Sequence, residues 1–369
     1  MVTITLAMLT GLEVAGRLLG VVGHMAASSP AISAEDAIGL KQSWGKQHLT
    51  DSAGSFNEYV TYVEFREKPH VSATLNIDNE GRRRVPGSCE HAQAFTVMAF
   101  GGSTMFGAGV PDPFTIPAYL ADMLNRQSRC VRVVNYGSGW WQSSQSLIQL
   151  LEVIKQGVRP QVVIFYDGIN EVNAVGFGGT PGGIAPDAGA ALKQAFELDT
   201  TSDWARFAQA SLVVRTLRSG LFPGRHKDRD NAYSIPAADI PGYATSLATI
   251  YATNVRTVNA LAREYGFAAY FFLQPVPMIA GKHNTTLEEA AFKERASTRG
   301  WEAAFFRQSY HAFAQHPYLR SIANYYDLSR IFDGMTEDLY LDSEHLLPEG
   351  NKIVAERIAR ELPLPPPLH

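Results

Sequence analysis

The chain has 369 residues, of which 46% are hydrophobic and 18% are charged, and its net charge is −4 at neutral pH. A chain this apolar can bury a large core, which excludes wholesale disorder. Acidic residues slightly outnumber basic ones, and Arg82-Arg83-Arg84 is the densest basic run, so a nucleic-acid partner is not expected.

The first thirty residues differ from the rest of the chain. Val2–Leu12 carries no charge, but eleven uncharged residues are too few to cross a bilayer. No Lys or Arg precedes this run, so the pattern of a secretory signal is incomplete. Residues 1–30 fit a weak or truncated export signal, a membrane-proximal amphipathic helix, or an ordinary packed helix. We expect an exported protein, periplasmic or membrane-associated, and leave a cytoplasmic location open.

From Phe95 onward, short apolar runs alternate with longer helical patterns. Apolar runs that end in polar residues or glycine are typical of parallel strands covered on both faces. The predicted strands are Phe95–Phe100, Val131–Asn135, Val162–Tyr166, Ala268–Leu273 and the weaker Asn324–Asp327. The predicted helices are Ile116–Asn125, Ser144–Ile154, Tyr243–Tyr265, Leu287–Phe313 and Gly350–Arg360. This alternation predicts an α/β fold of three layers, with a doubly wound parallel sheet between two layers of helices.

Two further regions accompany this main domain, residues 94–369. Residues 31–93 contain a β-like run, Tyr59–Phe65, and a turn, Asn76–Gly81, and we interpret them as an N-terminal extension packed on the main domain. Residues 173–242 form a long insertion after the third strand. Ligands of doubly wound sheets bind outside the carboxyl ends of the strands, so this insertion is expected to lie over the active site.

A serine and a histidine follow predicted strands in a way that suits nucleophilic catalysis. Ser103 comes directly after the first strand and two glycines, where a tight turn can expose its Oγ; a plain helix cap is the alternative. His345 follows Asp342 by three residues, so the carboxylate can hold the imidazole through Nδ1 while Nε2 faces a nucleophile. A surface pair is the alternative for these two residues.

Two loops can supply hydrogen-bond donors to an oxyanion. Asn170 follows the third strand and can donate from its side-chain amide, and a backbone N–H after the second strand can point to the same place. Ordinary turn chemistry explains both loops equally well. For Trp140-Trp141, core or lid packing and an apolar wall of an acyl site both stay open.

Together these residues fall in the order Ser, Gly, Asn and Asp-x-x-His, and in this the chain resembles the SGNH (GDSL-type) esterases and acylhydrolases from about residue 95 to residue 358. The resemblance implies a flavodoxin-like sheet of five parallel strands. It implies that Ser103 is the nucleophile and an oxyanion donor through its own N–H, and that Asn170 donates from its side chain. It also implies that His345 is the general base, oriented by Asp342.

The chain departs from the family pattern at two places. Gly-Asp-Ser-Leu is Gly101-Gly102-Ser103-Thr104 here, which keeps the nucleophile and is expected to affect turn packing more than chemistry. An ungapped count from Asn135 places the family's oxyanion glycine on Trp140. We expect Gly139 to be the backbone donor, with the Trp140 N–H as the alternative.

The expected function is a serine esterase or acylhydrolase that forms an acyl-enzyme on Ser103. Its substrate would be a small-molecule or glycan ester, which is to say a short-chain acyl ester, a lipid or an O-acetylated sugar. The enzyme would need no metal or organic cofactor. An O-acyltransferase to a glycan, using the same triad, is the first alternative. A non-catalytic accessory subunit at a membrane, associated through the N-terminus, is the second.

Cys89 and Cys130 each precede one of the first two strands, which start at the same edge of a parallel sheet. Adjacent strands lie about 4.8 Å apart, and a disulfide needs Cα atoms about 4.4–6.8 Å apart. The residues between Cys89 and Phe95 can close or miss that gap. Two free thiols are the preferred expectation; a bridge would favour export.

Overall fold

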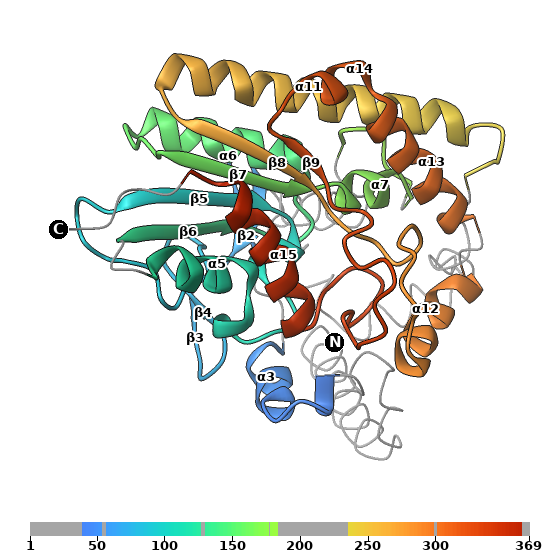
Figure 1. Cartoon of the computed structure of the whole chain (residues 1–369), viewed down its shortest axis with the longest axis horizontal. Coiled ribbons are helices and arrows are strands. Elements are labelled where there is room, and N and C mark those ends of the chain that lie inside the picture. Colours follow the sequence, from blue (N-terminus) through green and yellow to red (C-terminus); the bar gives the residue numbers. More distant parts are fainter. Residues whose placement is uncertain are drawn as a thin grey trace, which may run out of the picture. The chain divides into compact units, whose positions relative to one another are not determined.

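The computed structural model describes residues 39–53, 57–126, 130–176, 178–183, 235–298 and 301–363, with the side chains of 293–298 excepted. The segment 1–30 and most of the insertion, residues 184–234, lie outside the described residues. A sheet of five parallel strands forms the centre (Figure 1). The strands are β5 (Phe95–Gly101), β6 (Val131–Gly137), β7 (Val162–Asp167), β8 (Ala268–Leu273) and β9 (Tyr325–Asp327).

The strand order is β6-β5-β7-β8-β9, so the chain moves outward in one direction from β5 to β6 and in the other from β7 to β9. This arrangement confirms the predicted doubly wound, flavodoxin-like sheet. The direction of winding reverses between β5 and β7, and crevices in such sheets open at that point, beyond the carboxyl ends of the strands. The loops after β5 and β7 are those that carry Ser103 and Asn170.

Helices cover both faces of the sheet (Figure 1). One core cluster joins the sheet to α6 (Ser143–Lys155), α7 (Ile169–Gly176), α11 (Ile240–Tyr265) and α13 (Glu302–Gln315). A second cluster joins the opposite face to α5 (Ile116–Asn125) and α15 (Pro348–Glu361). Among the described residues, no helix is both long and apolar enough to span a bilayer.

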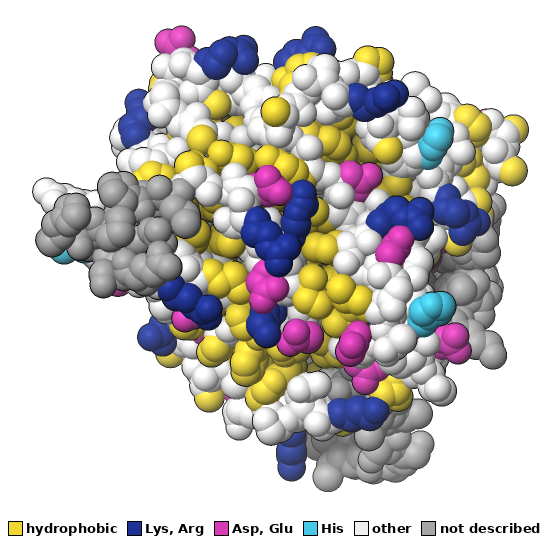
Figure 2. Space-filling view, viewed as in Figure 1, with side chains coloured by type: hydrophobic (Ala, Val, Ile, Leu, Met, Phe, Trp, Pro, Cys, Tyr) yellow, Lys and Arg dark blue, Asp and Glu magenta, His cyan; other side chains and the backbone are white. Residues whose placement is uncertain are grey.

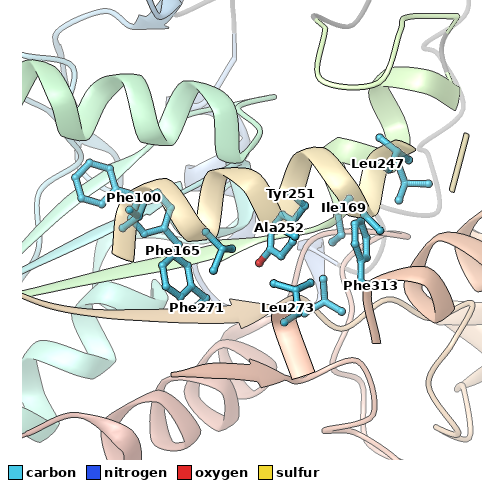
Figure 3. Packing of buried hydrophobic residues seen from close by; sticks show 14 of the residues in the cluster. Phe100, Phe165, Ile169, Leu247, Tyr251, Ala252, Phe271, Leu273 and Phe313 are labelled. Atoms are coloured by element: carbon cyan, nitrogen blue, oxygen red, sulfur yellow. The ribbon is translucent and has the colours of Figure 1, made fainter. Parts of the chain in front are cut away.

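A row of aromatic side chains crosses the sheet beneath α6 and α11 (Figure 3). Phe100 of β5 stacks on Tyr136 of β6 at 5.1 Å between ring centroids and on Phe165 of β7 at 5.2 Å. Phe165 in turn lies 5.5 Å from Phe271 of β8. Each such ring pair contributes about 0.5–1.5 kcal/mol beyond the burial of its area, so the row stabilises the strand register next to the site.

Two predicted elements differ from the structure. The predicted helix Leu287–Phe313 is two helices, α12 (Thr286–Thr298) and α13, and the chain between them contains Gly300, which has low helix propensity. The predicted strand Tyr59–Phe65 is a hairpin of β1 (Asn57–Val60) and β2 (Glu64–Glu67). Tyr62 in its turn and Glu64 at the start of β2 both have positive φ, and no glycine or asparagine marked the turn.

The N-terminal extension is built into the edge of the sheet. After β3 (His70–Val71) and β4 (Asn76–Ile77), Arg83 pairs with Asn135 of β6 in an antiparallel bridge. Farther along, Ser88 Oγ accepts the Val133 N–H at 2.9 Å and the Cys89 N–H donates to the Val131 carbonyl at 3.0 Å. Residues 83–89 therefore run along the outer side of β6.

The side chain of Arg83 also reaches the segment that follows Ser103. It is 2% exposed, and its Nε donates to Asp112 Oδ1 at 2.8 Å. Its other nitrogens donate to the carbonyl oxygens of Phe106, Gly107 and Val110, at and after the end of α4 (Ser103–Phe106). The buried guanidinium thus satisfies carbonyls that a helix of this length leaves without partners.

Cys89 and Cys130 form a disulfide with Cα atoms 5.3 Å apart, so the preferred expectation of two free thiols is wrong. The reason lies in the edge segment: because Cys89 hydrogen-bonds to β6, it is held beside Cys130, the residue that precedes β6. The residues before β5 therefore close the gap that the sequence left undecided.

The denatured, unreduced protein is expected to show no free thiol, and two thiols after reduction. The bridge joins residues separated by 41 positions, which corresponds to about 3–4 kcal/mol of stability in the chain-entropy model. A double Cys89→Ser, Cys130→Ser variant should lose that amount in denaturant unfolding. Thiols titrating in unreduced protein from an oxidising compartment would contradict the bridge.

Side chains of opposite charge are interspersed on the face shown in Figure 2, with hydrophobic side chains between them. This face carries no block of a single charge. The pattern fits a composition with 32 basic and 36 acidic residues.

Candidate active site

Ser103 begins α4 directly after β5 and is half-buried. The residue before it, Gly102, lies in a close approach: a Cβ at this position would stand 2.3 Å from Asn170 Nδ2 and 3.0 Å from the Trp141 carbonyl oxygen. No side chain fits there. This crowding requires glycine at position 102, and it places Asn170 beside the turn that carries Ser103.

The structure brings the three predicted catalytic side chains together in one relay. Ser103 Oγ lies 2.8 Å from His345 Nε2, and His345 Nδ1 lies 2.6 Å from Asp342 Oδ2. The histidine side chain is 20% exposed and the aspartate side chain 17%. An imidazole held in this way by a carboxylate can accept the proton of a serine hydroxyl.

The three-residue spacing from Asp342 to His345 comes from a local turn. Asp342 Oδ1 accepts the backbone N–H groups of Glu344 at 2.7 Å and His345 at 2.6 Å, while Oδ2 takes the imidazole. Burial alone would raise the pKa of Asp342, but the charge of His345 and these hydrogen bonds bring it below its ordinary value. Asp342 is therefore ionised at neutral pH.

Glu288 of α12 holds the base of the loop that carries Asp342 and His345. Its side chain is fully buried, and Oε1 accepts the N–H groups of Leu339 and Tyr340, both at 3.0 Å. Oε2 accepts the Nζ of buried Lys282 at 2.5 Å. Sequence reasoning missed this pair, because a Lys and a Glu six residues apart carry no local pattern.

Glu288→Gln is expected to lower the free energy of unfolding by about 1–3 kcal/mol, because Lys282 keeps its charge but loses a charged partner. Denaturant unfolding measures the change. The neighbouring Glu289→Gln is the control, since Glu289 is exposed. Equal stability of the two variants would contradict the role given to Glu288.

Asn170 lies in the first turn of α7, directly after the loop that follows β7. Its Nδ2 donates one hydrogen to the Trp141 carbonyl at 2.8 Å, which fixes the direction of the amide and of its second hydrogen. The start of α7 is tied in turn to Gln274 after β8, whose Oε1 accepts the Ile169 N–H at 3.0 Å and whose Nε2 donates to Thr104 Oγ1. Asn170 thus has the geometry of a preorganised donor.

The predicted backbone donor, Gly139, already has a partner in the structure. The Gly139 N–H donates to Glu67 Oε1 at 2.6 Å, so this donor is already engaged in the structure. Trp140 follows with a positive φ of 65° and is 45% exposed, whereas Trp141 is 3% exposed and donates from Nε1 to the Phe65 carbonyl. The two tryptophans therefore have different environments. Trp141 packs in the core, and Trp140 faces outward beside the site.

The insertion contributes residues near this loop. Its first residues, 173–176, are the end of α7, and Gln142, which precedes α6, donates from Nε2 to the Gly183 carbonyl at 2.6 Å. Residues 184–234 of this insertion lie outside the described residues.

Asn170→Ala is expected to lower kcat by about 10²–10³-fold with little change in KM, because an oxyanion donor acts mainly in the transition state. Steady-state hydrolysis of a p-nitrophenyl ester measures both constants. Asn259→Ala is the control, because Asn259 also hydrogen-bonds through its side chain but to Tyr318 and Asn324, in another part of the fold. A change in KM alone would make Asn170 a substrate-binding or turn residue.

No protein-family model matches the chain. No curated protein matches it either. Among solved structures, it is similar to an acetyl xylan esterase (12% identity, TM-score 0.37, covering 73% of this chain and all of that one). It is also similar to a member of the lipolytic protein G-D-S-L family from Veillonella parvula (9%, TM-score 0.35, covering 73% and 98%). A third is an acetyl xylan esterase from Geobacillus stearothermophilus (13%, TM-score 0.35, covering 75% and 96%).

Proposed function

We propose that this chain is a serine esterase or acylhydrolase of carboxylic esters. The observation that carries the proposal is the relay itself: Ser103 Oγ, His345 and Asp342 are linked at 2.8 Å and 2.6 Å. The position in the fold supports the proposal too. All three side chains stand in loops or at a helix start beyond the carboxyl ends of the strands, where doubly wound folds bind ligands.

The reaction would proceed in two halves. Ser103 Oγ attacks the ester carbonyl carbon as its proton passes to His345 Nε2, and Asp342 stabilises the imidazolium. The Asn170 amide would then hold the oxyanion of the tetrahedral intermediate, at about 3 kcal/mol for such a donor. His345 returns the proton to the leaving alcohol, and the acyl group stays on Ser103. Water then attacks the acyl-enzyme, with His345 again taking and returning a proton, and the carboxylic acid leaves.

An alkyl fluorophosphonate tests the assignment directly, because it reacts with an activated serine and loses fluoride. We expect one adduct on Ser103, found by peptide mass spectrometry, and loss of hydrolysis of p-nitrophenyl acetate in proportion to labelling. A panel of p-nitrophenyl esters of rising chain length and an acetylated glycan then defines the acyl and alcohol parts. A protein inert to the probe and to all of these esters would overturn the proposal.

We also propose that the protein works in an oxidising compartment. The Cys89–Cys130 disulfide supports this, because thiols in the cytosol are kept reduced. Fractionation of cells that express the full chain, followed by thiol titration of each fraction, tests it. Protein found only in the cytosol with both thiols free would contradict it.

A further inference from the structure

We propose that Glu67, in the N-terminal extension, is a positioning residue that holds the loop on the oxyanion side of the active site. It acts through the Gly139 amide and the Trp141 carbonyl on Asn170. The effect on turnover rests on the proposed esterase function, whereas the structural contact does not.

Glu67 ends β2 and points its carboxylate into the molecule. The residue is 5% exposed, and Oε1 accepts the Gly139 N–H at 2.6 Å. Burying a carboxyl group is costly unless hydrogen bonds compensate. Burial accordingly raises the pKa of Glu67, and the Gly139 bond acts in the opposite direction. Because both a carboxylate and a carboxylic acid can accept the Gly139 N–H, the contact needs an acceptor oxygen rather than a charge.

The same strand touches this region at two more points. The Phe65 carbonyl accepts Trp141 Nε1–H at 2.8 Å, and Glu64 Oε2 accepts Gln145 Nε2–H at 3.0 Å. Residues 64, 65 and 67 of β2 thus contact residues 145, 141 and 139 in reverse order. The β1–β2 hairpin therefore lies along the loop after β6 and the first turn of α6, and Glu67 is its contact nearest the end of β6.

The backbone beside the contact is held in an unfavourable conformation. Trp140, the residue after Gly139, has a positive φ of 65°, which a bulky side chain rarely adopts. Such a conformation persists only where the surroundings impose it. Glu67 fixes the amide on one side of Trp140, and Phe65 fixes the side chain of Trp141 on the other. The hairpin thus holds the loop on both sides of Trp140.

The position of the loop at residues 139–141 determines how the Asn170 amide is oriented. The Trp141 carbonyl accepts Asn170 Nδ2–H at 2.8 Å, and it lies 3.0 Å from where a Cβ on Gly102 would stand. Any shift of residues 139–141 therefore moves the atom that orients the Asn170 amide, within the crowded space next to Ser103. A displacement of this kind should weaken transition-state binding and leave substrate binding unchanged.

Three variants of the full-length protein test the proposal. Glu67→Ala removes the acceptor, Glu67→Gln keeps an acceptor oxygen, and Glu58→Ala is the matched control. Glu58 lies on the same hairpin but pairs with Arg66, not with the loop. Hydrogen–deuterium exchange of the peptide covering residues 137–142 reports the contact without any reference to activity. Hydrolysis of p-nitrophenyl acetate reports its effect on catalysis.

We expect Glu67→Ala to exchange at least about tenfold faster in this peptide and to lose about 10–100-fold in kcat, with KM within about threefold of wild type. Glu67→Gln should stay within about threefold of wild type in exchange and kcat, which also covers the case in which the alanine variant does not fold. Glu58→Ala should match wild type in both measurements.

The outcomes separate the two proposals. If exchange of residues 137–142 is unchanged in Glu67→Ala, or if Glu67→Gln loosens the loop fully, the positioning role is overturned whatever the activity. If the loop loosens but kcat does not fall, the contact is real and its role in positioning Asn170 is overturned. A wild type inert to fluorophosphonate and esters overturns the esterase function, and exchange still decides the contact.

Discussion

Replacing Ser103 with alanine is expected to lower kcat for ester hydrolysis by at least about 10⁴-fold, and His345→Ala should do the same. Removal of one member of such a relay costs nearly as much as removal of all of it, because nucleophile and base act as a unit. The relevant contact is the 2.8 Å hydrogen bond from Ser103 Oγ to His345 Nε2. Single-turnover and steady-state assays with p-nitrophenyl acetate measure the loss.

Both variants should keep the fold, since both residues are only half-buried. Thermal melting checks this, and Ser321→Ala, on an exposed serine at the end of a short helix, is a matched control for loss of a hydroxyl. Residual activity above about one hundredth of wild type in either variant would rule out the assigned relay, because the knockouts it implies cost orders of magnitude more.

Asp342→Asn is expected to reduce kcat by about 10⁴-fold while leaving the loop almost unchanged in shape. The amide oxygen can still accept the Glu344 and His345 N–H groups, but its NH₂ faces His345 Nδ1 and favours the tautomer that carries hydrogen on Nε2. That tautomer cannot accept the serine proton. A variant with more than about a tenth of wild-type kcat would show that Asp342 does not set the tautomer.

The effect of the same substitution on the free energy of unfolding should depend on pH. The pKa of Asp342 in the folded protein lies below its ordinary value, so its ionised form stabilises the fold. That contribution is complete above the unfolded value of about 4 and is lost as pH falls through the lowered folded value. The gap in unfolding free energy between wild type and Asp342→Asn should therefore shrink between pH 7 and pH 3. A gap that stays constant over this range would contradict the coupling.

Much of the fold could be predicted because its signals are local. Strands β5, β7 and β8 are largely apolar, and each strand of the sheet ends at or just before glycine or a polar residue. The five strands and the helices α5, α6, α11 and α15 were therefore predicted to within a few residues. The relay of Ser103, His345 and Asp342 could be predicted for the same reason. Ser103 sits at a strand end, and Asp342 and His345 share one turn, so spacing alone relates two of the three side chains.

What sequence could not supply are contacts between polar residues far apart in the chain. Glu67 meets Gly139 across 72 positions, and Arg83 meets Asp112 across 29. Neither has a period or spacing that marks it, and the β1–β2 turn lacks the residues that usually mark a hairpin. Gly139 was expected as a donor from the family resemblance with a one-residue shift, and the hydrogen bond that engages it comes from a strand whose position only the fold reveals.

The segment along β6 has a consequence for solubility. A strand at the end of a sheet offers unpaired N–H and C=O groups, and other chains can add to it as further strands. Here Arg83, Ser88 and Cys89 occupy positions on that side of β6, and the disulfide fastens the segment there. A chain cut before residue 94 would keep the relay residues but uncover this edge. Such a fragment should self-associate through β6, so attempts to isolate residues 94–369 alone would yield aggregates.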